Sequence, residues 1–427
     1  MPHTINQYAI PTTYYRGGTS KAIFFHEHVL PPPGPQRDRL LKRAIGSPDP
    51  LQLDGMGGSK AVTSKIAIVK PSTRPDADVD YTFAQVGVAD DFIGYDANCG
   101  NISAAVGPLA IDEGLEVRIY NTGTRKVLSA HVPITEKGSF ESEGTQAIAG
   151  VPGTGSPILM DYRFTIGAWL SRGLLPTGNI TDTLTVAGNE IQVTICDMAN
   201  LCVFANAKDF NITGHESAAD LTANSEWQTK TQELLGKAAV LAGLTDDWKA
   251  WVDKSYAIPL PIFVAPPPDP SKGHVSARLF LDKMCHESMA GTGAICTAAC
   301  SRVPGSVVNQ IIGQAADLET LEISHPIGTM DVCVQTETPV KGEPMFKTLS
   351  FVRTARRIMD GTIYVPNSFK PIVQETSIDA PPRNILLTAS KSAPMRGSLI
   401  YFVLCIIFFS IVCYSPASRF FWIGKQI

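Results

Sequence analysis

The sequence predicts an α+β protein built from two similar halves, each a β-sheet wrapped around one buried helix. Residues 99–112 (CGNISAAVGPLAID) and 290–303 (AGTGAICTAACSRV) carry small or apolar residues on nearly every side. A helix that is apolar all round is a buried helix. Each segment begins at a small-residue turn, ends at a glycine or proline signal, and precedes a strand-like run and a glycine turn. Because Cys99 and Ala290 are 191 residues apart, we expect an internal repeat.

The length of the chain agrees with two domains. A chain of 427 residues is long for a single hydrophobic core. We place the two halves at residues 1–185 and 186–370, followed by a linker and hydrophobic tail at 371–427.

Shorter patterns supply the other elements. Runs of β-branched residues bounded by turn residues, such as 65–69 and 115–120, predict strands. Residues 36–45 and 225–242 have the spacing of helices with one apolar face. Together these patterns add sheets and outer helices to the two buried helices.

The composition excludes some classes of function. The net charge is −4, so the chain has no basic field that would hold nucleic acid. A polyanionic ligand would need a local cluster of hydrogen-bond donors. The nine cysteines occur without a CxxC pair, which is typical of reduced thiols in a cytoplasmic protein. The first residues show neither a basic nor an apolar signal-peptide region.

Residues 398–414 form an uncharged apolar run of 17 residues. This length is at the lower limit for a helix that spans a membrane, about 17–25 residues. One interpretation is a tail that anchors a cytoplasmic protein to a membrane, and the other is an extension outside the fold. Both stay open on the sequence.

The starts of the two buried helices predict an anion site. The first N–H groups of a helix have no intrahelical partner, and the helix dipole is positive there. Glycines let a ligand approach this backbone closely. The same field favours the deprotonated form of a thiol at the first turn, which makes Cys99 a candidate proton-transfer group. The candidate backbone donors are Gly100, Asn101, Gly291, Thr292 and Gly293.

Two further segments are rich in glycine and hydroxyl side chains. They are residues 16–21 (RGGTSK) and 55–65 (GMGGSKAVTSK). Neither fits the phosphate-binding pattern G-x-x-x-x-G-K-[ST]. Each is therefore either a cradle for an oxyanion or only a loop.

Taken together, these segments resemble the PrpF family of isomerases, which includes aconitate, methylitaconate and oxalomesaconate isomerases. The matching stretches run in order along residues 8–366: 12–25 (TTYYRGGTSKAIFF), 52–69, 96–115 (DANCGNISAAVGPLAIDEGL), 174–179, 290–300 (AGTGAICTAAC), 323–332 and 353–366. The resemblance implies two domains of the diaminopimelate-epimerase fold, each a β-sheet or barrel around a central helix. It also implies an active site in the cleft between them.

The resemblance also assigns roles to residues. Epimerases of this fold carry a cysteine at both helix starts, whereas here Cys99 faces a position occupied by Ala290. Cys285 is a weak substitute because it lies five residues earlier. The allylic isomerases of the family use a lysine and a cysteine, and the lysine falls on Lys65. This difference favours an isomerase over an epimerase.

We therefore predict a 1,3-proton shift in an unsaturated di- or tricarboxylic acid such as aconitate or an alkyl-substituted analogue. Lys65 and Cys99 would move the proton, and the helix N–H groups would stabilise the dienolate. Further candidates for holding carboxylates are Arg16, Ser20, Lys21 and Ser64. The step needs no nicotinamide, flavin or metal, and we expect no metal site.

Three alternatives remain at this point. The chain could be a tautomerase or epimerase of a small acid, although the missing second thiol counts against an epimerase. It could be a non-catalytic protein that keeps the fold, or a membrane-tethered protein that assists a partner. A homodimer is a further assembly to consider.

Overall fold

The computed structural model describes residues 6–113, 117–254, 258–269, 271, 273–281, 283–313, 318–337 and 345–371. The chain up to Pro371 forms one compact unit. Among the described residues, no helix is long and apolar enough to cross a membrane. The apolar run 398–414 lies outside the described residues, so its membrane contact stays a prediction, as do the boundary near residue 185 and a homodimer.

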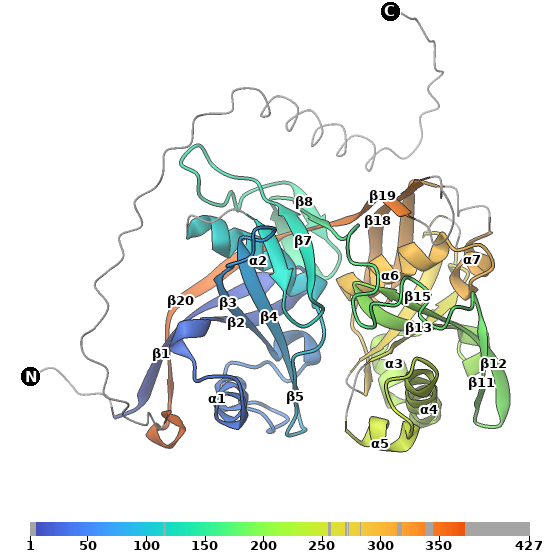
Figure 1. Cartoon of the computed structure of the whole chain (residues 1–427), viewed down its shortest axis with the longest axis horizontal. Coiled ribbons are helices and arrows are strands. Elements are labelled where there is room, and N and C mark those ends of the chain that lie inside the picture. Colours follow the sequence, from blue (N-terminus) through green and yellow to red (C-terminus); the bar gives the residue numbers. More distant parts are fainter. Residues whose placement is uncertain are drawn as a thin grey trace, which may run out of the picture. The chain divides into compact units, whose positions relative to one another are not determined.

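The first half of this unit combines short helices with a strongly curved sheet (Figure 1). Its helices are α1 (Pro35–Ile45) and α2 (Gly100–Asp112). Its strands are β1 (Tyr8–Gly17), β2 (Ser20–His26), β3 (Lys65–Pro71), β4 (Val79–Val86), β5 (Ile93–Gly94), β6 (Arg118–Asn121), β7 (Lys126–His131), the hairpin β8 (Gln146–Ile148) and β9 (Val151–Gly155), and β10 (Ile158–Asp161).

The second half has the same kinds of element in the same order. Its helices are α3 (Ala218–Ala223), α4 (Ser225–Leu241), α5 (Trp248–Asp253), α6 (Gly291–Ser301) and α7 (Val307–Ile312). Its strands are β11 (Asp182–Val186), β12 (Asn189–Met198), β13 (Asn200–Asn206), β14 (Leu260–Ala265), β15 (Val275–Leu281), β16 (Met284–Cys285), β17 (Thr320–His325), β18 (Gly328–Glu337) and β19 (Met345–Arg353).

The strand pairings confirm the predicted repeat. The first half pairs its strands in the order β1-β2-β3-β4-β6-β7-β10, with the parallel pairs β2–β3 and β4–β6. The second half pairs β12-β13-β14-β15-β17-β18-β19, with the parallel pairs β13–β14 and β15–β17 at the equivalent places. A buried helix follows the fourth strand in both halves, α2 in one and α6 in the other.

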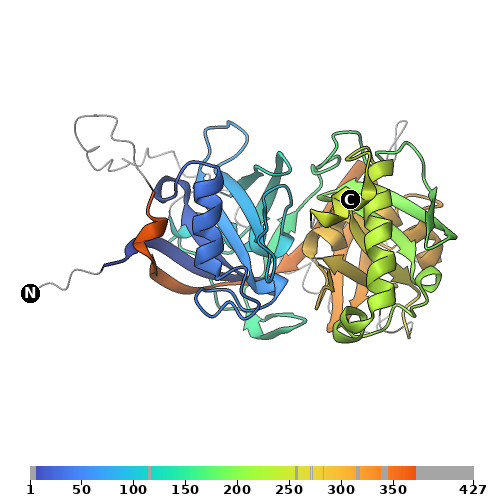
Figure 2. The ribbon, with the colours of Figure 1, turned by 90° about the horizontal axis from the view of Figure 1, so that it is seen from below.

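Each sheet has a central helix on one face and outer helices on the other. Phe24 of β2 packs in the cluster around α2, whereas Phe25 packs in the cluster that contains Leu41 of α1. This alternation follows from the two-residue period of a strand. Figure 2 shows α1 and α4 lying on the outside of their sheets. The central helices are buried along nearly their whole length, as their all-apolar sequences predict.

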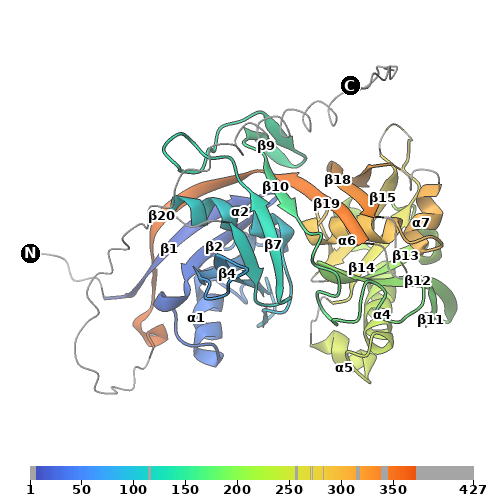
Figure 3. The same ribbon diagram turned by 45° about the horizontal axis from the view of Figure 1, so that its top comes forward.

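The last strand, β20 (Ala355–Val365), pairs with β1 rather than with the second half. Figure 3 shows β20 running along β1 after β19. The pairing is antiparallel and covers β1 from Tyr8 to Gly17. The sequence does not predict this return, because strand pairing at such a separation leaves no local pattern.

The Arg16–Lys21 turn supports the start of α2. Gly18 has φ +48°, and its N–H donates to the carbonyl oxygen of Thr354. A Cβ atom at Gly17 would lie 2.2 Å from the carbonyl oxygen of Asn101, in the first turn of α2. The glycines of this turn are therefore needed for close packing of one backbone on another.

Gly17→Ala is expected to lower the free energy of unfolding by about 3 kcal/mol, because the new methyl group must displace the backbone of α2. Chemical denaturation with and without the substitution measures this difference. Gly361→Ala in the neighbouring strand is a matched control, since nothing lies within 4 Å of a Cβ there. Equal stability of the two variants would contradict the close contact.

Candidate active site

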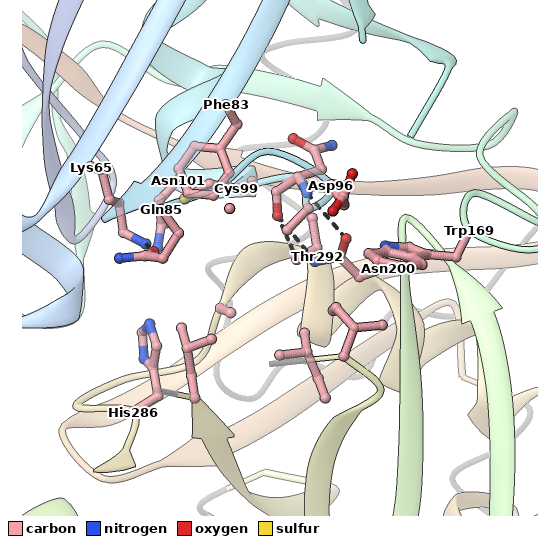
Figure 4. Close-up of a pocket in the computed structure, with 18 of the residues that line it drawn as sticks. Lys65, Phe83, Gln85, Asp96, Cys99, Asn101, Trp169, Asn200, His286 and Thr292 are labelled. Atoms are coloured by element: carbon pink, nitrogen blue, oxygen red, sulfur yellow. Dashed lines mark hydrogen bonds between the residues drawn. The ribbon is translucent and has the colours of Figure 1, made fainter. Parts of the chain in front are cut away.

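A cavity of about 80 Å³ lies where the starts of α2 and α6 meet. Residues from both halves of the sequence line it, and Figure 4 shows their side chains around it. Five of the residues that the sequence singles out are among them: Lys65, Cys99, Gly100, Asn101 and Thr292. The two helix starts and the lysine are thus brought together, as the sequence predicts.

The two helix starts at the cavity differ from those of four other helices, α3, α4, α5 and α7. Among the described residues, no side chain caps the first turn of α2 or α6. In contrast, Ser217, Asn224, Asp247 and Ser306 cap α3, α4, α5 and α7 with side-chain oxygens. Capping by a side chain satisfies the first N–H groups of a helix. At α2 and α6 these groups receive no such side-chain cap among the described residues.

The first turns of α2 and α6 touch each other through glycine. A Cβ atom at Gly100 would lie 3.0 Å from the amide nitrogen of Thr292 and 3.1 Å from Gly291 Cα. A polar network crosses the same junction. Asn200 Nδ2 donates to the carbonyl oxygen of Asn98 at 3.0 Å and to Thr292 Oγ1 at 2.9 Å. Both helix starts are therefore held in a fixed relation at the cavity wall.

Lys65 is the first residue of β3, and its side chain is only 3% exposed. Its Nζ donates to Gln85 Oε1 at 2.5 Å and lies 5.1 Å from the centre of the Phe83 ring. The Gln85 amide is itself oriented, because its Nε2 donates to the carbonyl oxygens of Ala61 and Ser64. The wall of the cavity therefore contains a buried amine that is held by a neutral amide oxygen.

Cys99 is the residue immediately before α2 and lies partly exposed at the cavity. Ala290, which takes the equivalent place before α6, also lines the cavity. Cys285 does not line it, and its Sγ is directed to the carbonyl oxygen of His286 at 3.8 Å. Burial raises the pKa of Cys285 to about 12. Cys285 is therefore a poor replacement for a second catalytic thiol.

His286 lines the cavity and was not singled out from the sequence. Its Nδ1 accepts a hydrogen bond from the Ser288 N–H at 3.1 Å, so the proton of the neutral ring is on Nε2. Burial, and then the nearby charge of Lys65, lower the pKa of His286 to about 4. The ring is therefore a neutral hydrogen-bond donor at ordinary pH.

This lowered pKa predicts a pH dependence of stability. A histidine in the unfolded chain has a pKa of about 6.5, so the unfolded state binds the proton more readily. The contribution of His286 is complete above pH 6.5 and is lost as pH falls toward 4. Chemical denaturation should show a loss of stability across this range, of which about 3 kcal/mol disappears in His286→Asn. His325 stays in both proteins, so identical pH profiles would contradict the assignment.

Two more buried groups near the cavity were not singled out from the sequence. Arg353 Nε donates to Asn101 Oδ1 at 2.8 Å, which places a guanidinium behind the first turn of α2. Burial lowers the pKa of Arg353 to about 10, so it remains charged at neutral pH. Trp169 lines the cavity, and its buried Nε1 has no hydrogen-bond partner among the described residues. Their sequence positions carry no local pattern that marks them as site residues.

The other predicted binding residues lie away from this cavity. Arg16 donates to the carbonyl oxygens of Gly18 and Thr354. Lys21 lies over the Tyr14 ring, and Ser64 Oγ donates to Gln52 Oε1.

The remaining three predicted binding residues are one serine and two glycines. Ser20 Oγ is buried without a partner among the described residues. Gly291 contacts Gly100, and Gly293 faces Leu279 in the core of the second half. Contacts of these residues with a carboxylate stay a prediction.

The chain is similar to known isomerases along most of its length. The PrpF protein family matches residues 7–366. A 3-methylitaconate isomerase of Eubacterium barkeri is 40% identical over 84% of this chain and 98% of its own length. A (4E)-oxalomesaconate Delta-isomerase of Novosphingobium sp. (strain KA1) is 37% identical over 84% of this chain and 98% of its own.

Solved structures agree with this relation. The crystal structure of a methylitaconate-delta-isomerase matches with a TM-score of 0.68 and 39% identity, covering 85% of this chain and 97% of the other. A probable proline racemase from Agrobacterium radiobacter K84 has a TM-score of 0.52 at 13% identity over 83% and 92% of the two chains, which shows a shared fold alone. The epimerase-like α+β fold expected from the sequence is thereby confirmed. The chain belongs to the PrpF family, and it is an isomerase.

Proposed function

We propose that the chain catalyses a 1,3-proton shift that moves a carbon–carbon double bond within an unsaturated di- or tricarboxylic acid. The observation that carries the proposal is the placement of Lys65 and Cys99 on one cavity beside two uncapped helix starts. The amine and the thiol can move a proton, and the helix starts can hold carboxylates. The proposal uses the amine and the thiol as two separate groups, one to remove the proton and one to return it.

The field in the cavity suits a polyanion, although the net charge of the chain is −4. Among the described residues that line it, Lys65 is the only Lys or Arg and Asp96 the only Asp or Glu, so the positive field has to come from the helix ends and from Arg353 nearby. The N-terminal ends of α2 and α6 each add about half a positive charge. Arg353 adds a buried guanidinium behind α2. An acid with two or three carboxylates would therefore be attracted to this place in an otherwise acidic protein.

The proposed reaction needs one base and one acid. One of Lys65 and Cys99 removes a proton from the carbon that is allylic to the alkene and α to a carboxylate. The C–H electron pair enters the conjugated system and forms a dienolate. The second group then donates a proton two carbons away, and the double bond lies in its new position. The proton count is unchanged, and both groups return to their starting forms after exchange with solvent.

The dienolate would be stabilised by neutral donors that are already in place. These are the N–H groups of Gly100, Asn101 and Thr292 and the Nε2–H of His286. Preorganised donors of this kind are worth about 3–4 kcal/mol each in mutagenesis. A neutral imidazole suits the role, because it donates without giving up its proton.

The substrate class rests on the related enzymes. The two relatives above are named for 3-methylitaconate and (4E)-oxalomesaconate. We therefore propose an unsaturated polycarboxylic acid of similar size as the substrate of this chain. Ala290 at the second helix start supports an isomerase over a two-thiol epimerase, because the opposite face of the cavity has no cysteine among the described lining residues.

The test is turnover in deuterium oxide without added cofactor. The purified chain is incubated separately with cis-aconitate, trans-aconitate, methylitaconate and oxalomesaconate, and the products are followed by NMR. The proposal expects isomerisation of at least one acid, with deuterium at the carbon that gains the proton. Neither turnover nor deuterium incorporation with any of them would overturn it. Conversion of a keto acid to its enol alone would support a tautomerase instead.

A further inference from the structure

A second and larger cavity of about 290 Å³ adjoins the first. It lies between residues 60–62, helix α3 and the turn that contains β16. Leu281 and His286 line both cavities, so these two side chains form their common wall. A group attached to a molecule in the first cavity would therefore meet the second one next to His286.

The walls of this second cavity are mainly apolar. Alkyl groups of Val62, Ala219, Ala223, Leu281 and Met284 line it. Ala219 and Ala223 are four residues apart on α3, so their methyl groups share one face of the helix. Such a wall favours an apolar occupant over a charged one.

Three of the polar side chains in the same walls, Lys60, Glu287 and Thr222, already have partners. Lys60 Nζ pairs with Glu287 Oε1 at 3.0 Å. Thr222 Oγ1 accepts the Cys285 N–H at 3.1 Å. A carboxylate in this cavity would have to compete with Glu287 for Lys60. Because Glu287 already occupies Lys60, the apolar part of the wall is what remains for an added substituent.

We propose that this second cavity is a subsite for an apolar substituent of the acid. The substrate class is then an unsaturated polycarboxylic acid that carries a linear alkyl chain on the carbon nearest His286. This inference rests on the proposed function, because it places the carboxylates and the alkene in the first cavity. Leu281 and His286 would contact the first carbons of the chain, and α3 the later ones.

The inference predicts a dependence on chain length. Each methylene that moves from water into an apolar site gains up to about fourfold in binding. Acids of one skeleton that carry hydrogen, methyl, butyl or hexyl are compared by kcat/KM in the NMR assay. Their Kd values are measured in parallel by isothermal titration calorimetry. Both kcat/KM and affinity should improve from hydrogen to butyl by at least tenfold.

A substitution in α3 tests whether the preference for longer alkyl chains arises in the second cavity. Ala223→Phe fills the subsite, and the preference for the butyl acid over the unsubstituted acid should fall at least tenfold. Ala250→Phe on α5 is the matched control, because Ala250 is exposed like Ala223 but lines neither cavity. The butyl preference should be unchanged there.

The outcomes separate the two proposals. The subsite would be overturned if kcat/KM and Kd did not change with the length of the alkyl chain. An equal loss of the butyl preference in Ala223→Phe and Ala250→Phe would also overturn it, even if the unsubstituted acid is isomerised. If calorimetry shows the chain-length dependence and its loss in Ala223→Phe but no acid is isomerised, the subsite stands and the proposed reaction fails. No binding of any acid would overturn both.

Discussion

Replacing Lys65 with methionine is expected to lower kcat by about a thousandfold or more. The substitution keeps an unbranched side chain next to Phe83 but removes the amine that lies at the cavity. A positioned general acid or base contributes about 10²–10⁴-fold to rate. The loss should be in kcat, because the helix starts that bind the acid remain. NMR progress curves at saturating and low substrate measure kcat and KM separately.

Lys70→Met is the control for Lys65. Lys70 is in the same strand, is exposed, and pairs with Glu27 at 2.7 Å. Its loss should change kcat by less than twofold. Thermal unfolding checks that both variants keep the fold. A Lys65→Met enzyme that retains more than a tenth of the kcat would remove Lys65 from the proton shift.

Replacing Cys99 with serine is expected to have an effect of similar size. Serine keeps the shape of the side chain at the start of α2, but a hydroxyl is a much weaker acid than a thiol. Loss of a proton-transfer group predicts a fall in kcat of about a thousandfold. The assay is the same NMR measurement. Cys99→Ala should behave alike, since both substitutions remove the thiol.

Cys333 provides the comparison for Cys99. These two are partly exposed, whereas the other five cysteines in the described part of the chain are buried. Cys333→Ser should retain activity. Alkylation by iodoacetamide should inactivate the wild type and the Cys333→Ser variant, and a bound polycarboxylate should protect both. Full activity of Cys99→Ser, or inactivation that depends on Cys333, would contradict the assignment.

The sequence predicts the fold well because its strongest patterns are local. The helices at 100–112 and 291–301 are apolar all round, and such patterns require burial whatever surrounds them. The amphipathic helix expected at 225–242 is α4. The return of β20 to β1 was not predicted, because the two strands are more than 300 residues apart.

The site was predicted where a residue type by itself signals chemistry. Cys99 and the glycines mark the helix starts, and the family resemblance marks Lys65. Gln85 was missed because its role depends on the register that places it opposite Lys65. His286 and Trp169 were missed because their positions at the cavity result from tertiary packing.

The RGGTSK turn was interpreted as a cradle or a loop, and the structure shows why its glycines are needed. Gly17 and Gly18 pack against Asn101, so the turn contacts the first turn of α2. Its glycine content therefore has a packing reason, and a direct contact of Arg16, Ser20 or Lys21 with substrate stays a prediction.

The central claim is that Lys65 and Cys99 divide one proton shift between them. The most direct measurement is solvent exchange of the allylic proton in deuterium oxide, followed by NMR in the Lys65→Met and Cys99→Ala variants. The variant that keeps the base should exchange the proton of the substrate without isomerising it, and the other variant should do neither. Loss of exchange and isomerisation together in one variant, with both retained in the other, would contradict this division and leave a single group that moves the proton.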